Sequence, residues 1–159
     1  SIPMNLVQTQ NVKDVDAKGI STCAVLDNKS VSCWGKNEYG QLGNGITGGS
    51  NSVPMIVSEI SNVTAITNGY RHACAVLDNK SVQCWGRNNY GQLGHGTRVD
   101  RNVPTGVKGV TNVVEIAPGY RHTCALLDND TIQCWGQNNY GQLGDGTIIN
   151  RTTPAEVQF

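Results

Sequence analysis

The segment Cys134-Trp-Gly-Gln-Asn-Asn-Tyr-Gly-Gln-Leu-Gly-Asp-Gly146 has two further close copies in this 159-residue chain, and this recurrence indicates the type of fold. The copies begin at Cys33 and Cys84, so the motif recurs at intervals of 51 and 50 residues. A period of about 20–50 residues indicates a repeat architecture, in which each unit buries its apolar face against its neighbours. The sequence therefore predicts an array of similar units.

The repeat extends over the whole chain. Residues 54–103 and 104–153 align without gaps, and 28 of their 50 positions are identical. The first unit has one additional residue between Gly43 and Pro54, which we interpret as an insertion in a surface loop. With boundaries at the recurring prolines, the repeats are residues 3–53, 54–103 and 104–153, and residues 154–159 are the first strand of a further unit.

Each unit contains a β-hairpin. Residues 124–134 place apolar and β-branched residues on both sides of the turn cluster Asp128-Asn129-Asp130, so that Leu126 lies opposite Ile132 and Cys124 opposite Cys134. A further strand is predicted near Val63–Ile66 and its equivalents, and a fourth after each proline. Proline lacks a backbone N–H, but at the start of a strand or on a sheet edge no hydrogen bond between strands is lost. Four short strands per unit, with no helical periodicity, are typical of a β-propeller blade.

The pattern Trp-Gly-x-Asn-x-Tyr-Gly-Gln-Leu-Gly-x-Gly, with the preceding Gly-x-x-His-x-Cys-Ala-Leu, closely resembles the repeat of the regulator of chromosome condensation family. The resemblance covers all three units. It implies an all-β fold, a propeller of radially arranged four-stranded blades, of which the best-known members have seven. It also implies structural roles for His72 and His122, because the family repeat has histidine at this position.

Three units cannot close a propeller, since natural propellers have four or more blades. The chain also has more proline-led strands, at Pro3, Pro54, Pro104 and Pro154, than it has cysteine hairpins. We therefore expect an incomplete arc, which is either part of a longer ring or completed by identical chains. A dimer would give six blades, and a contact that does not close would give a filament.

The six cysteines pair as Cys23 with Cys33, Cys74 with Cys84 and Cys124 with Cys134, and we expect three disulfides. Reduced packing thiols and a zinc site with His72 or His122 are the alternatives. Ser21 replaces the histidine in the first unit although its cysteines remain, which disfavours zinc and a Cys–His nucleophile. Paired cysteines indicate an extracellular, cell-surface or periplasmic protein. Five glycosylation-type sequons, three of them at the hairpin turns, are explained more simply by turn chemistry.

Composition excludes several classes of function. The net charge of zero provides no long-range field for nucleic acid, and the apolar runs are too short for membrane insertion. The glycine-rich turn lacks the lysine of a phosphate loop. No catalytic constellation recurs, so we expect no enzymatic activity, no cofactor, no metal and no small-molecule substrate.

The candidate binding residues are of two kinds. Tyr and Arg recur just before the strands that we expect to be innermost, and arginines also occur in the variable segments 97–102 and 147–152, on loops of the kind that differentiate partners. These candidates are Tyr70, Arg71, Tyr120, Arg121, Arg98, Arg101 and Arg151. The residues predicted to be structural are Trp34, Trp85, Trp135, Leu42, Leu93 and Leu143, in addition to His72 and His122.

The sequence thus predicts a non-catalytic propeller module that binds protein or assembles with other copies of itself. Alternative hypotheses are a subunit of an extracellular fibre and a secreted enzyme inhibitor, since a secreted member of the family inhibits β-lactamases. Guanine-nucleotide exchange with chromatin binding, the activity of the family's founder, is disfavoured by the neutral charge and the paired cysteines.

Overall fold

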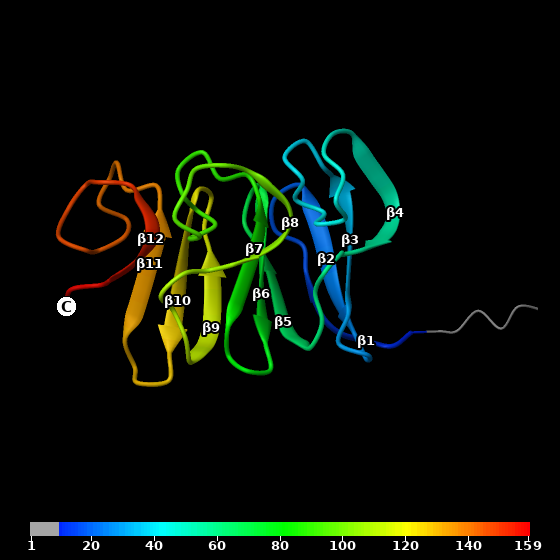
Figure 1. The fold of residues 1–159 in the computed structure, drawn as a ribbon, viewed down its shortest axis with the longest axis horizontal. Helices are drawn as coiled ribbons and strands as arrows, with labels where there is room; N and C mark the ends of the chain where they lie inside the picture. The colour runs from blue at the N-terminus through cyan, green and yellow to red at the C-terminus, as the bar shows by residue number, and fades with distance from the viewer. Residues whose placement is uncertain (1–9) are drawn as a thin grey trace, which may run out of the picture.

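The computed structural model describes residues 10–159, which form three four-stranded sheets and no helix (Figure 1). The first sheet contains β1 (Val12–Asp16), β2 (Ser21–Leu26), β3 (Val31–Lys36) and β4 (Ser50–Ile56). The second contains β5 (Val63–Asn68), β6 (His72–Leu77), β7 (Val82–Gly86) and β8 (Arg101–Gly106). The third contains β9 (Val113–Pro118), β10 (His122–Leu127), β11 (Ile132–Gly136) and β12 (Arg151–Glu156). The prediction of all-β, four-stranded blades is confirmed.

The central hairpin of each sheet has the predicted register. In the third sheet Leu126 pairs with Ile132 and Cys124 with Cys134, and the first two sheets repeat this pairing. The turn is closed locally, because the Asn129 side chain accepts a hydrogen bond from the backbone N–H of Thr131. This short-range turn chemistry explains why the register could be derived from sequence.

All three predicted disulfides are present, and each joins directly opposed residues whose Cα atoms are 4.1 Å apart. They leave no free cysteine among the described residues, so the zinc site considered for Cys74, Cys84 and His72 has lost both thiol ligands. Each bridge closes a short loop and is expected to contribute about 2–3 kcal/mol. The bridges fasten the two central strands of every sheet.

The proline-containing strands occupy a different place from the one that we expected. β12, which contains Pro154, pairs with β11 and is the fourth strand of the third sheet, so residues 154–156 do not begin a further blade. β4 and β8 likewise complete the sheets that precede them in the chain. Proline is tolerated there because these are edge strands. The strand expected after Pro3 lies outside the described residues.

The sheets lie side by side along the molecule and meet most closely at one edge (Figure 1). There β5 contacts β1 and β2, and β9 contacts β5 and β6. Asp14 of β1 accepts a hydrogen bond from the backbone N–H of Ile66, and Asp16 accepts one from that of Asn68. The innermost strands are therefore β1, β5 and β9. The prediction that the histidine-led strands β6 and β10 are innermost is wrong, because each is second in its sheet.

A tryptophan closes each seam between sheets. Trp85 is fully buried between the first two sheets and donates a 3.0 Å hydrogen bond to the backbone oxygen of Gln41, and Trp135 repeats this contact with Gln92 at 2.9 Å. Leu42 and Leu93, next in the chain to these acceptors, are also fully buried. The same loop thus supplies an apolar side chain and a polar acceptor to the following sheet.

The array does not close into a ring. Leu126 and Ile132, on the outward face of the third sheet, line an open cavity of about 240 Å³. Their equivalents Val76 and Val82 are buried by the third sheet. The third sheet therefore presents an apolar face without a neighbour among the described residues. Within residues 10–159, no helix is long and apolar enough to span a membrane.

Candidate interaction surface

The recurring Tyr-Arg pairs are at the tips of two turns on the end of the molecule that carries the long loops. The turn between β5 and β6 is closed by a 2.8 Å hydrogen bond from the N–H of Gly69 to the oxygen of His72, and Gly119 repeats it before β10. The hydrogen bond of each turn encloses two residues, which are Tyr70 and Arg71 in the first turn and Tyr120 and Arg121 in the second. All four residues are half-buried or exposed.

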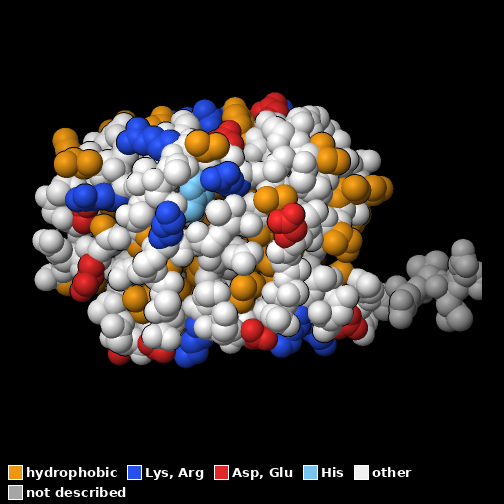
Figure 2. Space-filling model, in the orientation of Figure 1, with side chains coloured by type: hydrophobic (Ala, Val, Ile, Leu, Met, Phe, Trp, Pro, Cys, Tyr) orange, Lys and Arg blue, Asp and Glu red, His pale blue; other side chains and the backbone are white. Residues whose placement is uncertain are grey.

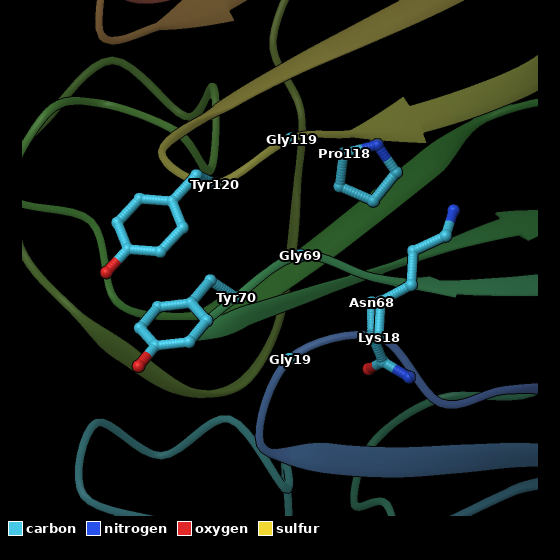
Figure 3. Close-up of a pocket in the computed structure, with 8 residues that line it drawn as sticks. All are labelled: Lys18, Gly19, Asn68, Gly69, Tyr70, Pro118, Gly119 and Tyr120. Carbon is cyan, nitrogen blue, oxygen red and sulfur yellow. The ribbon is translucent and has the colours of Figure 1, made fainter.

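Tyr70 and Tyr120 stack on each other across the second seam. Their ring centroids are 4.2 Å apart and their planes are inclined by 18°. Figure 3 shows the two rings face to face beside the turns that contain Gly69 and Gly119. The rings form one side of a cavity of about 210 Å³, and Lys18 and Asn68 form the other. The structure therefore brings together two predicted binding residues from different repeats.

The arginine beside each of these tyrosines reaches back to the preceding sheet. Arg71 donates a 2.9 Å hydrogen bond to the hydroxyl of Tyr39, and its guanidinium lies 5.0 Å from the centroid of that ring and 5.2 Å from the centroid of Tyr70. Arg87 lies 4.5 Å from the same Tyr39 ring. Two cations thus share one tyrosine by cation–π attraction.

The contact recurs one repeat later. Arg121 donates a 3.0 Å hydrogen bond to the hydroxyl of Tyr90 and lies 5.1 Å from the ring centroids of both Tyr90 and Tyr120. The stacked pair Tyr70–Tyr120 joins the two groups. The resulting Tyr–Arg ladder consists of Arg87, Tyr39, Arg71, Tyr70, Tyr120, Arg121 and Tyr90.

The ladder is irregular at its two ends. Ile20 and Ser21 stand in the first repeat where the others have arginine and histidine, so the first sheet contributes no arginine. Tyr140, the third-repeat equivalent of Tyr39 and Tyr90, is 89% exposed. No arginine follows it on a fourth sheet in the described part of the chain. The ladder is therefore a property of the two seams that the structure contains.

The three arginines of the variable segments are distributed differently. Arg98 is exposed in the loop before β8, and Arg101 is half-buried at the start of that strand. Arg151 forms a 2.6 Å ion pair with Asp145. Burial alone would raise the pKa of Asp145, but hydrogen bonds from Thr147 and Arg151 lower it to about 2. Arg151 is thus committed to an internal partner and is not part of the ladder.

The two histidines predicted to be structural differ in burial. His72 is buried in the second seam with its Nε2 atom 3.0 Å from the hydroxyl of Thr123. Burial, assisted by the nearby His122, lowers the pKa of His72 to about 3, so its ring is neutral at physiological pH. His122 is half-buried on the outward side of the third sheet, and burial lowers its pKa as well.

Of the remaining predicted structural residues, Trp85, Trp135, Leu42, Leu93 and Leu143 are fully buried, and Trp34 is half-buried on the first sheet. Sequence reasoning assigned no binding role to Tyr39, Tyr90 and Arg87. The available signal was the tyrosine of the Asn-x-Tyr-Gly-Gln-Leu motif, which we interpreted only as part of the scaffold. Among the described residues, no three His, Cys, Asp or Glu side chains converge to form a metal site.

Comparison with known proteins agrees with this architecture. The family model for the regulator of chromosome condensation (RCC1) repeat matches residues 30–76, 81–126 and 131–159, and a second model for this repeat matches residues 12–41, 63–92 and 113–142. The matches occur once per repeat and cover most of the chain.

Among curated proteins, the chain is 33% identical over 106 residues to the probable E3 ubiquitin-protein ligase HERC4 of Rattus norvegicus, which covers 64% of this chain and 10% of HERC4. It is 37% identical over 82 residues to the ultraviolet-B receptor UVR8 of Arabidopsis thaliana, which covers 51% of this chain and 19% of UVR8. The chain therefore spans only a small part of these relatives.

Among solved structures, human WBSCR16 superposes with a TM-score of 0.82 at 26% identity, over 94% of this chain and 40% of WBSCR16. Prp20p of Saccharomyces cerevisiae superposes with a TM-score of 0.84 at 20% identity, over 93% of this chain and 38% of Prp20p. The repeat matches, the blade topology and these superpositions agree, and the chain belongs to the RCC1 repeat family.

Proposed function

We propose that this chain is a non-catalytic protein-binding segment of a β-propeller, which binds its partner through the Tyr–Arg ladder. The observation that carries the proposal is the stack of Tyr70 on Tyr120, which merges the Arg71 and Arg121 contacts into one surface across two seams. Tyr and Arg are enriched in interface hot spots. Tyr provides a large, rigid contact area at low entropic cost, and Arg provides a planar fork of hydrogen-bond donors.

The side chains of the ladder are held by mutual contacts but remain accessible. The hydroxyls of Tyr39 and Tyr90 accept hydrogen bonds from arginine, whereas Tyr120 remains 55% exposed. Side chains that are already ordered lose little conformational entropy when a partner binds, so more of the contact energy contributes to affinity. Such a surface favours a protein partner over a small molecule, because the adjoining cavity is shallow and only about 210 Å³ in volume.

We further propose that the protein functions in an oxidising compartment, outside the cytoplasm. The support is the bridging of all six cysteines, since structural disulfides persist mainly in extracellular and periplasmic proteins. Blocking free thiols in intact source cells, followed by reduction and mass spectrometry, tests this. All six cysteines are expected to be protected before reduction, and alkylation without reduction would contradict the proposal.

Protein partners also occur among the structural relatives. Yeast RCC1 (Prp20) has been solved with Kap60 bound, and the study of Prp20p concerns its binding to Gsp1p and histones. These partners belong to those proteins, and what this chain shares with them is the scaffold. The ligase activity likewise belongs to HERC4, of which this chain corresponds to only 10%.

Self-association is a second candidate function, favoured by the apolar outward face of the third sheet. The first sheet of another copy could cover Leu126 and Ile132 as the third sheet covers their equivalents. Such a seam would still lack the arginine contact to Tyr140, because Ile20 occupies the arginine position. Light scattering on the non-reduced protein separates the outcomes. A larger mass than the 17.0 kDa of one chain supports self-association, and a clean monomer rejects it.

Site-specific photo-crosslinking tests the main proposal. The photoreactive residue p-benzoylphenylalanine is introduced at Tyr120 on the ladder and, as the control, at the exposed Asn79 on the opposite end of the molecule. After incubation with surface and secreted proteins of the source cells, adducts are expected from position 120 only. Their loss in the Tyr70→Ser variant would assign them to the ladder. Absence of adducts, or equal adducts from both positions, would overturn the proposal.

A further inference from the structure

The arginines of this protein are confined to one end of the molecule, although its net charge is zero. All six occur in the turns before β6 and β10, directly after β7, in the loop before β8, or at the first residues of β8 and β12. Figure 2 shows several basic side chains over the half of the molecule where the long loops lie, and others interspersed with acidic side chains at the hairpin end. The opposite end, which carries the hairpin turns, has acidic residues and lysines but no arginine.

The charges at the hairpin end already have partners. Lys29 lies 3.7 Å from Asp78, and Lys80 lies 3.2 Å from Asp128, so each pair joins one sheet to the next. The lysines and carboxylates of successive hairpin turns therefore neutralise one another. This end of the molecule has no comparable excess of positive charge.

The arginines at the loop end lack such partners. Of the six, only Arg151 has a carboxylate within 4.0 Å among the described residues. The acidic side chains at this end have other contacts. Glu38 forms an ion pair with Lys36. Asp100 accepts a hydrogen bond from the backbone N–H of Asn88, and Asp16 accepts one from the backbone N–H of Asn68. Within residues 10–159, no carboxylate therefore forms an ion pair with Arg71, Arg87, Arg98, Arg101 or Arg121, although Glu38 is near enough to Arg71 for their charges to attract.

Three of these arginines come from adjacent strand ends of the second sheet. Arg71 precedes His72, which pairs with Gly86, and Gly86 in turn pairs with Arg101 and precedes Arg87. The Nε atoms of Arg71 and Arg101 are buried without a hydrogen-bond partner. Like charges brought together in this way repel, so an unpaired cluster is a cost to the free protein that an anionic partner would relieve.

The tyrosines hold the guanidinium groups in a favourable orientation for such a partner. Arg71 and Arg121 contact tyrosine rings and use one N–H on a tyrosine hydroxyl, which leaves other donors of a planar fork free. A guanidinium fork fits a carboxylate in a bidentate manner. Lysine would provide the charge but not this geometry.

We propose that the loop-end face formed by Arg71, Arg87, Arg98, Arg101 and Arg121 binds an Asp/Glu-rich segment of the partner protein; this inference rests on the proposed function. A nucleic acid is a poorer fit. The net charge is zero, and the faces of Tyr70 and Tyr120 are turned to each other and to arginine, so they are not open platforms for bases.

Fluorescence anisotropy with defined probes tests the proposal. The probes are a labelled twelve-residue Glu/Gly peptide, the same peptide with Gln in place of Glu, and a twelve-nucleotide single-stranded DNA. The test variant is Arg87→Gln with Arg98→Gln, because Gln137 already occupies the position equivalent to Arg87 in the third repeat. The matched control, Lys29→Gln with Lys80→Gln, removes the same charge from the hairpin end.

The wild-type chain and the lysine variant are expected to bind the Glu peptide, and the arginine variant to bind it roughly tenfold more weakly, as expected for the loss of charge-assisted hydrogen bonds. Replacing Arg87 and Arg98 by lysine should restore only part of the affinity. Equal binding of the Gln peptide, equal loss in both charge variants, preference for the DNA, or no binding of the Glu peptide would each overturn the inference.

The Tyr120 crosslinking experiment separates this inference from the proposed function. If adducts form at Tyr120 and neither the Glu peptide nor the Arg87→Gln/Arg98→Gln change reduces them, protein binding by the ladder stands and the acidic partner is rejected. If no adducts form at all, the proposed function itself fails. Competition by the Glu peptide supports both.

Discussion

Arg71 Nη1 donates a 2.9 Å hydrogen bond to Tyr39 Oη and thereby joins a turn of the second sheet to a loop of the first. Arg121 and Tyr90 form the same bond across the next seam at 3.0 Å. The residues proposed to bind a partner therefore also hold neighbouring sheets together. This dual role determines how their substitution can be interpreted.

Replacing Arg71 by alanine is expected to lower the free energy of unfolding by about 1–2 kcal/mol, because a half-buried hydrogen bond and its cation–π contacts are lost. Urea denaturation measures the change. Arg98→Ala, which removes an exposed arginine without such contacts, should change it by less than about 0.5 kcal/mol. A double-mutant cycle with Tyr39→Phe that shows no coupling would contradict the assignment.

The buried His72 is expected to make stability depend on pH. Burial, with a smaller effect of His122, lowers its folded-state pKa to about 3, whereas its ordinary value is 6.5. The unfolded chain binds the additional proton between these values, so the contribution is complete above pH 6.5 and is lost as the pH falls toward 3. The free energy of unfolding should decrease by about 1 kcal/mol between pH 7.5 and 5.5 from this group alone.

The His72→Gln variant provides the comparison, since its side chain can still reach the hydroxyl of Thr123 but does not titrate. Chemical denaturation at several pH values measures both proteins. The pH dependence of the variant should be shallower than that of the wild type over this range. Parallel profiles would show that His72 does not titrate on unfolding.

Gly94 is expected to be intolerant of a side chain. Its φ is +72°, and a Cβ atom would lie 2.7 Å from the indole nitrogen of Trp135 and 2.8 Å from Val107. Gly94→Ala should therefore lower the free energy of unfolding by about 2 kcal/mol or more, from backbone strain and displacement of the seam. Gly106→Ala is the control, because a Cβ there meets nothing within 4 Å. Equal stability of the two variants would reject this account.

The third disulfide should be reduced first. Cys23, Cys33, Cys74 and Cys84 are fully buried, whereas Cys124 is partly exposed on the outward face of the third sheet. Thiol–disulfide exchange needs access to a sulfur, so we expect reduction of Cys124–Cys134 to be on the order of tenfold faster. Timed alkylation and peptide mass spectrometry measure the order. Simultaneous reduction of all three would indicate that global opening controls access.

The hairpin, its register and its disulfide were predictable because they depend on neighbours in sequence. The turn at Asn129 lies midway between Cys124 and Cys134. Because side chains alternate between the two faces of a strand, the register set by this turn places the two cysteines opposite each other on the same face. The assignment of Pro154 to a further blade failed for a related reason. A repeat boundary can be drawn at any point of the sequence period. Only the antiparallel pairing of β12 with β11 shows which sheet the strand completes.

The repeat, the four-stranded unit, the cysteine pairing and the family follow from the sequence alone, because all of them are encoded in local pattern and fixed spacing. The contact of Tyr39 with Arg71, the stacking of Tyr70 on Tyr120 and the different burial of His72 and His122 could be seen only in the folded chain. These contacts depend on how one sheet packs against the next. That packing brings together residues from different repeats, and no periodicity within one strand or turn encodes it.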